Sequence, residues 1–465
     1  MYLEEWFKIM KKLLFSASAF VFIAVSSAAL VPTNAEAIPV FARKYGMSCA
    51  ACHTMFPKLT KMGVAFRERG FRFSAGRDDI DSQDERGANF ATDAKSVFAS
   101  SFPFTVRTQI LATSAAPIVD KPGPLIASTP VMPGHRPGML DGAGVGNTKV
   151  GFGEFGLISS GSYDDFSWWL DSSLAGGIAM LEGVYYADDL LKIRFGRVQN
   201  NVGYGMTMMS KRPLAYGWND AAQMAGGTML MMADGISIHG TTNGDSGVGT
   251  YYDLTLGTYG KDTKSQLGST SVYGRIAQEI NDNYIVGVYG YKAKNYTSDV
   301  FGGGAPMKMA MGSAVLNTAT DMSFKDVTRY GVDFALNYGE PLQLWGAYTA
   351  GKQTSYANQA LKVQAITLSG EWKFTDSDLL GVKYDSSRAD LQMIMPNGTA
   401  GMVLRPSTTT NTTLFGIHQL AENVQAVLSV TRTNNQVDYM GMSMMKTTAA
   451  QRSFTTGLLA IDIAL

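Results

Sequence analysis

The amino-acid sequence predicts an all-β fold, a transmembrane outer-membrane β-barrel of about sixteen strands. The chain has 465 residues with 50 glycines, only 17% of its residues are charged, and its mean hydropathy is near zero, at −0.02. Beyond the N-terminal region, the sequence has no second apolar run long enough for a membrane helix. Instead, stretches of about ten residues alternate apolar with polar or small residues and are separated by turn residues, which is typical of membrane-spanning strands.

The expected strands follow one another between residues 101 and 465. In one of them, Phe166, Trp168 and Leu170 share one face and alternate with Ser167 and Asp171, as a strand with lipid on one side requires. A soluble β-sandwich or a β-propeller also uses alternating strands, but the sequence shows no repeat of blade length, and the strands are long for a sandwich. The expected strands are 102–112, 148–159, 166–175, 178–187, 190–198, 235–242, 248–259, 270–280, 284–295, 327–338, 342–350, 361–374, 378–389, 408–419, 424–433 and 453–465.

Short and long connections alternate along the barrel region. Outer-membrane barrels have short periplasmic turns and long outside loops, and an even strand number puts both ends of the barrel on the periplasmic side. The expected short turns are 162–165, 188–189, 243–245, 281–283, 339–341, 375–377 and 421–423, and the long connections are 113–147, 200–234, 296–326, 390–407 and 434–452. Aromatic residues near strand ends are expected to form the interfacial girdles, and they include Trp168, Trp169, Tyr185, Tyr186, Tyr289 and Tyr291.

A C-x-x-C-H motif lies upstream of the barrel and uses the only two cysteines of the chain, Cys49 and Cys52, followed by His53. This spacing is typical of c-type haem attachment, in which the two thiols bind one porphyrin and the histidine is the proximal ligand of the iron. A redox disulfide or half of a zinc site also uses a C-x-x-C pair. The chain has no second cysteine pair and a histidine follows at once, so the motif predicts one covalently attached haem c.

The N-terminal region has the pattern of a secretion signal, which haem attachment outside the cytoplasm requires. Lys11 and Lys12 precede an apolar run over 13–31, and Ala35-Glu36-Ala37 gives a small-x-small cleavage pattern,. An uncleaved membrane anchor is the alternative. We expect residues 1–37 to be a cleaved signal peptide, 38–77 the monohaem cytochrome c segment, 78–100 an acidic linker and 101–465 the barrel.

The haem segment is strongly basic and very short. About 40 residues cannot bury a haem in a core of their own, so we expect the haem segment to lie in the lumen of the barrel. The basic residues suit a polar lumen and the haem propionates, or a surface that docks an acidic periplasmic protein. Between positions 43 and 77 they are Arg43, Lys44, Lys58, Lys61, Arg67, Arg69, Arg72 and Arg77, against the single acidic residue Glu68.

The residues flanking the motif are Ile38-Pro39-Val40-Phe41-Ala42-Arg43-Lys44-Tyr45-Gly46 before it, and Thr54, Pro57-Lys58-Leu59-Thr60, Gly63, Phe66 and Gly70-Phe71 after it. With these residues the chain resembles the fused monohaem c-type cytochrome–porin family of outer-membrane Fe(II)-oxidising cytochromes. The resemblance implies a one-electron redox protein, an Fe(II):cytochrome c oxidoreductase if it is an enzyme. It would be surrounded by outer-membrane lipid and pass electrons from extracellular Fe(II) to periplasmic c-type cytochromes. No nucleic-acid partner is expected.

The sixth ligand of the haem iron is open in the sequence. Methionine would raise the potential, and Met62 is our candidate, with Met47 and Met55 also close to the motif. The barrel histidines are His135, His239 and His418. No catalytic triad, hydrolase metal motif or phosphate loop is present. Two further functions stay open: electron export to an extracellular acceptor, and a diffusion porin with a haem-bearing plug.

Overall fold

The structure, a computed structural model, describes parts of the chain separated by gaps. The expected signal peptide (1–37) and acidic linker (78–100) lie outside the described residues. No helix among the described residues is both long and apolar enough to cross a membrane. The described residues are 49–55, 58–71, 104–115, 119–120, 148–163, 165–173, 177–199, 232–242, 249–258, 270–281, 283–296, 308–311, 314–317, 324–337, 340–354, 360–394, 400–421, 424–440 and 447–464.

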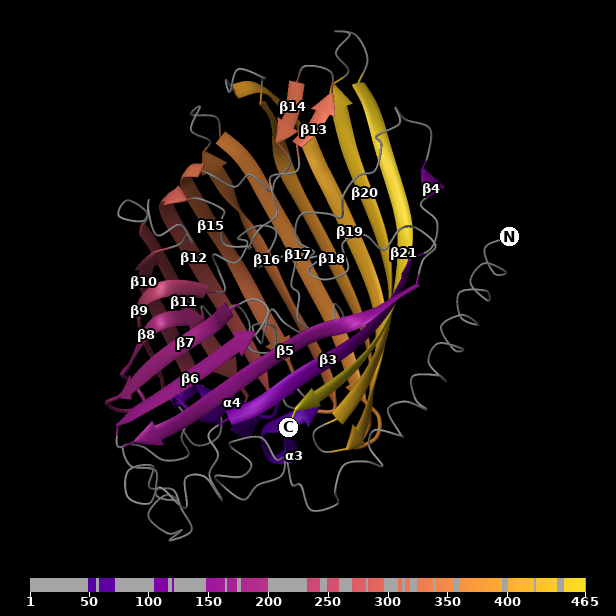
Figure 1. Cartoon of the computed structure of the whole chain (residues 1–465). Helices are drawn as coiled ribbons and strands as arrows, with labels where there is room; N and C mark the ends of the chain where they lie inside the picture. The colour runs from indigo at the N-terminus through magenta and orange to yellow at the C-terminus, as the bar shows by residue number, and fades with distance from the viewer. Residues whose placement is uncertain are drawn as a thin grey trace.

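Sixteen antiparallel strands form a closed barrel, which confirms the predicted fold (Figure 1). Each strand pairs with its neighbours in the chain, and the last strand pairs with the first to close the cylinder. The sixteen strands are β3 (Phe104–Ala115), β5 (Thr148–Tyr163), β6 (Phe166–Ser173), β7 (Gly177–Tyr186), β8 (Lys192–Gln199), β9 (Met232–Thr241), β10 (Thr250–Thr258), β11 (Thr270–Ile280), β12 (Tyr284–Tyr296), β15 (Phe324–Leu336), β16 (Leu342–Thr354), β17 (Ala360–Lys373), β18 (Asp378–Ile394), β19 (Ala400–Ala421), β20 (Val424–Met440) and β21 (Thr447–Ala464).

Several strands extend farther toward the long connections than predicted. β18 and β19 take up most of the expected loop 390–407, and β20 and β21 most of 434–452. These stretches were expected to be long connections, but the antiparallel ladder continues into them. Three short strands accompany the barrel: β4 (Val119–Asp120) pairs with β21, and β13 (Lys308–Met311) forms a hairpin with β14 (Ala314–Asn317), which pairs with β18.

Both ends of the barrel lie at the edge that carries the short turns, as the even strand number predicts. Phe104, the first residue of β3, pairs with Ser159 near the end of β5, and Ala464, the last residue of β21, pairs with Arg107. The chain that carries the predicted haem segment therefore enters the barrel at the short-turn end, which is the periplasmic end of an outer-membrane barrel.

The strands are apolar outside and polar inside. Along β11, Ser271, Tyr273 and Arg275 are buried toward the lumen, whereas Val272 and Ile276 are exposed on the outer surface, Ile276 by 60%. A soluble protein shows the opposite pattern, because water would face its outer surface. Exposed apolar side chains around a closed barrel are the lipid-facing surface of an outer-membrane protein.

The prediction of aromatic girdles was wrong for four of the six residues named. Trp169, Tyr186, Tyr289 and Tyr291 are buried on the lumen side. Neighbouring residues of a strand point to opposite faces, so only one residue of each adjacent pair could reach lipid. The exposed aromatic residues of the outer surface include Tyr185, Tyr284, Trp372 and Phe374 near the short turns and Tyr330, Tyr348 and Tyr384 farther along the strands.

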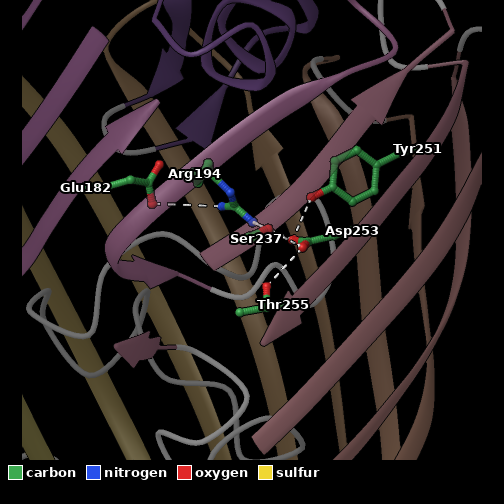
Figure 2. A network of polar contacts seen from close by, with 6 residues as sticks. All are labelled: Glu182, Arg194, Ser237, Tyr251, Asp253 and Thr255. Carbon is green, nitrogen blue, oxygen red and sulfur yellow. Dashed lines mark hydrogen bonds and ion pairs between the residues drawn. The ribbon is translucent and has the colours of Figure 1, made fainter. Parts of the chain in front are cut away.

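Charged side chains on the lumen wall pair across several strands. Figure 2 shows Arg194 of β8 between Glu182 of β7 and Asp253 of β10. Asp253 also accepts hydrogen bonds from Ser237 Oγ (2.7 Å) and Thr255 Oγ1 (3.0 Å). These residues are buried, so the lumen wall here is a network of mutually compensating charges,.

A second buried ion pair continues this network. Arg275 Nε and Nη2 donate to the two carboxylate oxygens of Asp333 at 2.9 and 2.6 Å, and the Arg275 guanidinium also lies over the Tyr251 ring at 5.4 Å. The pair spans β12 at Gly287, where an added Cβ would lie 2.7 Å from Arg275 Nη2 and 2.9 Å from Asp333 Oδ1. A side chain at this position would therefore force the ion pair to shift.

We expect Asp333→Asn to destabilise the barrel by about 3–5 kcal/mol, because it leaves the buried Arg275 charge without its carboxylate. Urea unfolding of the detergent-solubilised protein, followed by tryptophan fluorescence, measures the change. Asp376→Asn is the matched control, since Asp376 is fully exposed and approaches Lys373 only to 4.0 Å. Equal unfolding midpoints for the two variants would contradict a structural role for the Arg275–Asp333 pair.

Candidate haem-attachment site

The C-x-x-C-H motif folds as a single helical turn followed by a tight hairpin. Cys49 and Cys52 begin and end the turn α3 (Cys49–Cys52), so they occupy positions i and i+3, which lie on one face of a helix,. His53 opens β1 (His53–Met55) and pairs with Leu59 of β2 (Lys58–Leu59). The thiol of Cys52 is free and partly exposed.

Thr60 connects the motif to the helix that follows it. The Thr60 N–H donates to the Cys52 carbonyl at 2.9 Å, and its hydroxyl donates to the Ala51 carbonyl at 2.8 Å. Thr60 is also the N-cap of α4 (Lys61–Glu68), because its Oγ1 accepts the Gly63 N–H at 3.1 Å,. One residue thus fixes the position of the motif relative to α4.

Gly63 allows the first turn of α4 to lie directly against the motif. A Cβ added at this position would overlap the backbone carbonyl of Cys52. Because backbone cannot move aside as a flexible side chain can, the close contact between α3 and α4 requires glycine here.

Helix α4 lies inside the short-turn end of the barrel (Figure 1). Its residues Val64, Ala65 and Phe66 are buried. After the helix, Phe71 stacks on the lumen-facing Trp169 of β6 with ring centroids 4.9 Å apart. Gly70, at φ 75°, lies so close to the lumen-facing Val184 of β7 that an added Cβ would be 2.9 Å from its side chain. The described part of the predicted haem segment is therefore within the lumen, at its periplasmic mouth.

Two basic residues of the segment contact the periplasmic turns of the barrel. Lys61 Nζ donates to Asn283 Oδ1 at 2.6 Å and lies 3.7 Å from Glu340. At the other end of α4, Arg69 Nε lies 3.4 Å from Asp189. These three turns connect β11 to β12, β15 to β16 and β7 to β8, so α4 reaches across the mouth. The Lys61–Glu340 pair is partly exposed and contributes little stability,; it orients the helix, while the buried Arg69, Phe71 and the buried face of α4 supply most of its packing.

The residues present fit a c-type haem. They provide two cysteines at i and i+3, a histidine directly after them, and a Cys52 thiol that is free and partly exposed,. Burial raises the pKa of the Cys52 thiol, so in the haem-free segment the thiol stays protonated at neutral pH. No group of three or more His, Cys, Asp or Glu residues that could hold a separate metal ion is present in the described part of the chain.

The structure distinguishes among the residues that are candidates for the sixth ligand of the haem iron. Met62 is the second residue of α4 and is 37% exposed, on the helix that packs against the motif. His239 is buried on the lumen side of β9, whereas His418 is exposed on the outer surface, where its Nδ1 lies 2.8 Å from Asp378 Oδ1. His418 therefore cannot face a group in the lumen. Met47 and His135 lie outside the described residues, and only the backbone of Met55 is described.

The sequence did not predict which barrel residues contact the segment. Asn283, Glu340, Asp189 and Trp169 come from four different hairpins, and no local pattern shows that they surround one helix. The N-cap residue Thr60, three positions before Gly63, was the one available signal, because this spacing is typical of a helix start.

No protein-family model matches the chain, and a search of curated proteins finds no match. Among solved structures, OmpT of Vibrio cholerae is 10% identical, with a TM-score of 0.49 over 78% of this chain and 97% of that chain. The outer membrane channel DcaP of Acinetobacter baumannii is 9% identical (TM-score 0.47; 78% and 96% covered). An anion-selective porin from Comamonas acidovorans is 14% identical (TM-score 0.45; 78% and 98% covered).

We expect the double variant Arg69→Gln, Phe71→Ala to release the segment from the barrel mouth, because it removes the Asp189 ion pair and the stacking on Trp169. Protease cleavage of the segment should become about tenfold faster or more, since cleavage follows the fraction of time that the segment is undocked. Limited trypsin digestion in detergent measures this. Lys373→Gln is a control at the same end of the barrel; if it sensitises the segment equally, these contacts do not hold α4.

In the Cys49→Ala variant produced without haem, Cys52 is the only cysteine, and its alkylation reports its pKa. Because burial raises the pKa of the thiol, the rate of reaction with iodoacetamide should rise at a higher pH in the folded protein than in the urea-unfolded protein. Mass spectrometry of the alkylated protein across a pH series measures both curves. Coincident curves would show that Cys52 is not buried against α4.

Proposed function

We propose that the protein is an outer-membrane cytochrome–porin that moves single electrons through one covalently attached haem c, from extracellular Fe(II) to periplasmic c-type cytochromes. The observation that carries the proposal is the C-x-x-C-H motif on a segment whose helix α4 is seated in the periplasmic mouth of a transmembrane barrel. A redox-active segment at this position could exchange electrons with both the lumen and a periplasmic partner.

Each residue of the site has a distinct task in this proposal. Cys49 and Cys52 would hold the haem through thioether bonds, and His53 would ligate its iron. Thr60 and Gly63 hold the motif against α4, while Lys61, Arg69 and Phe71 hold α4 against the barrel. When bound, the haem supplies a one-electron Fe(III)/Fe(II) couple, which matches a one-electron donor such as Fe(II).

The barrel offers a route between the two sides of the membrane, whichever way the electrons move. Its apolar band is expected to be about 25 Å tall, so a donor outside and an acceptor in the periplasm cannot meet across lipid. Buried charged side chains such as Arg194, Asp253 and Asp333 line the lumen. A polar lumen accommodates a hydrated ion, whereas the lipid does not. A periplasmic cytochrome would accept electrons from the segment at the short-turn end of the barrel.

Two other functions use the same architecture. Electron export to an extracellular acceptor reverses the direction and requires a lower haem potential. A diffusion porin with a haem-bearing plug uses the docking of α4 in the mouth to block solutes. Reduction kinetics separate Fe(II) oxidation from both alternatives.

We expect the oxidised, detergent-solubilised protein to be reduced rapidly by Fe(II) under anaerobic conditions, because Fe(II) is the proposed donor. Stopped-flow absorbance of the haem bands across a pH range measures the reaction. The Cys49→Ala, Cys52→Ala variant should show no haem bands. A correctly attached haem that Fe(II) cannot reduce would rule out the iron-oxidising function and leave export or the plugged porin.

If Met62 is the sixth ligand, Met62→Ala should lower the midpoint potential of the haem, because methionine ligation raises it. The charge-transfer band characteristic of methionine-ligated ferric haem should also disappear. Spectroelectrochemical titration measures both, and His239→Ala is the comparison variant. A band and potential unchanged in Met62→Ala would exclude Met62.

A further inference from the structure

The barrel wall is low where β6 and β7 form it. β6 has 8 residues, paired with β7 from Phe166 opposite Tyr185 to Ser173 opposite Gly177, and residues 174–176 alone connect the two strands. A strand needs about 9–11 residues to cross the hydrocarbon of a membrane. In Figure 1 this side of the barrel ends well below the tops of β18 to β21. We call the outer surface of β6, β7, β8 and β9 the low wall.

On the low wall, a charged residue faces outward much closer to the short turns than on the taller side of the barrel. Arg197 is on the same face of β8 as the exposed Phe195 and lies only five residues after Lys192, where the strand begins. On β16, the exposed Lys352 lies ten residues after Leu342, where that strand begins. At about 2.5 Å of height per residue in a tilted strand, ten residues span the apolar band of about 25 Å and five reach its middle.

Arg197 forms an ion pair with Asp234 of β9 on this outer surface. The two residues are directly opposite each other, and Arg197 Nε and Nη2 donate to the two carboxylate oxygens of Asp234 at 2.7 and 3.1 Å. Their side chains are nevertheless 36% and 47% exposed. The middle of the lipid-facing surface is the most costly depth for a charged side chain. The pair is therefore expected to be covered by protein and not by lipid tails.

Large apolar side chains surround the ion pair. Leu181 of β7 is directly opposite Arg197 and is exposed. The rings of Phe166 and Phe195 lie 5.8 Å apart and meet over Gly183, where an added Cβ would be 2.6 Å from Phe195 Cζ. Exposed aromatic and aliphatic side chains around a few charges are typical of the core of a protein–protein interface.

We propose that the low wall is the contact surface between copies of this chain in the outer membrane. The surface is self-complementary, because it carries one charge of each sign side by side within an apolar surround. Across a symmetry axis, Arg197 of one copy can face Asp234 of the partner subunit, and the same contact then forms in reverse. Lipid tails offer neither charge. The contact also removes from lipid the part of the barrel that is too short to span it, and it is independent of the haem and of electron transfer.

Photo-crosslinking in outer membranes tests this contact. The full-length protein carries the photoreactive residue p-benzoylphenylalanine in place of Phe195 on the low wall or, as the matched control, in place of Tyr330 on β15. Both are exposed aromatic residues of the outer surface. Irradiation should give a species of twice the mass of the chain from the Phe195 position and none from the Tyr330 position. The proposal is overturned if the Phe195 position gives no doubled species, if it captures only a different protein, or if both positions give the doubled species equally.

Charge variants test the role of the ion pair, with native mass spectrometry in mild detergent as the measure of association. Arg197→Glu places two acidic side chains opposite each other and should weaken association about 100-fold. The double variant Arg197→Glu, Asp234→Arg restores both charges and should associate as the unmodified protein does, which separates a lost contact from misfolding. Lys294→Glu is the control, because it creates the same acidic pair with Asp326 away from the low wall. An unmodified protein that is monomeric, or equal association of Arg197→Glu and Lys294→Glu, would overturn the proposal.

Discussion

The hydrocarbon of a membrane offers no hydrogen-bond partner to backbone N–H and C=O groups, so a sheet can cross it only as a closed cylinder. Here closure is made by β21, whose residues from Thr456 to Ala464 pair with β3 from Ala115 back to Arg107. Once the cylinder is closed, strand alternation divides all side chains between lipid and lumen. Apolar residues on the outer surface, buried ion pairs inside and a mouth that can receive a helix all follow from this division.

On the lumen wall, long polar side chains cross neighbouring strands at glycine positions and reach partners on the far side. The Arg275–Asp333 pair crosses β12 at Gly287, and the Tyr289 hydroxyl crosses β15 at Gly331 to reach Thr349 on β16. In both cases a partner two strands away satisfies a polar group that no adjacent residue could reach. A buried charge is tolerated where it is paired, as in the Arg275–Asp333 pair,, and the glycines leave the space in which these side chains cross.

The sequence was sufficient to predict the barrel fold but not the contacts between the N-terminal segment and the barrel. All sixteen strands lie where alternation and turn residues placed them, because both signals are local,. The ends of β18 and β20 and the starts of β19 and β21 were missed, because a strand that has left the lipid no longer needs an apolar outer face. Tyr289 and Tyr291 were assigned to the lipid face although they are buried in the lumen. The motif at Cys49, Cys52 and His53 could be found from its spacing. The contacts of the segment with Trp169 and Asp189 could not, because they join residues far apart in the sequence.

The small size of the segment that carries the C-x-x-C-H motif explains why motif and barrel belong to one chain. The motif turn α3 has one short helix to pack against, and that helix has its buried face and Phe71 inside the barrel. A segment of this length gains too little from its own burial to fold alone. Its ion pair at Lys61 is partly exposed and sets direction more than stability,, whereas Arg69 is buried beside Asp189. The lumen wall therefore supplies apolar contacts that the segment cannot make within itself. The same packing that stabilises the segment also fixes its position at the periplasmic mouth.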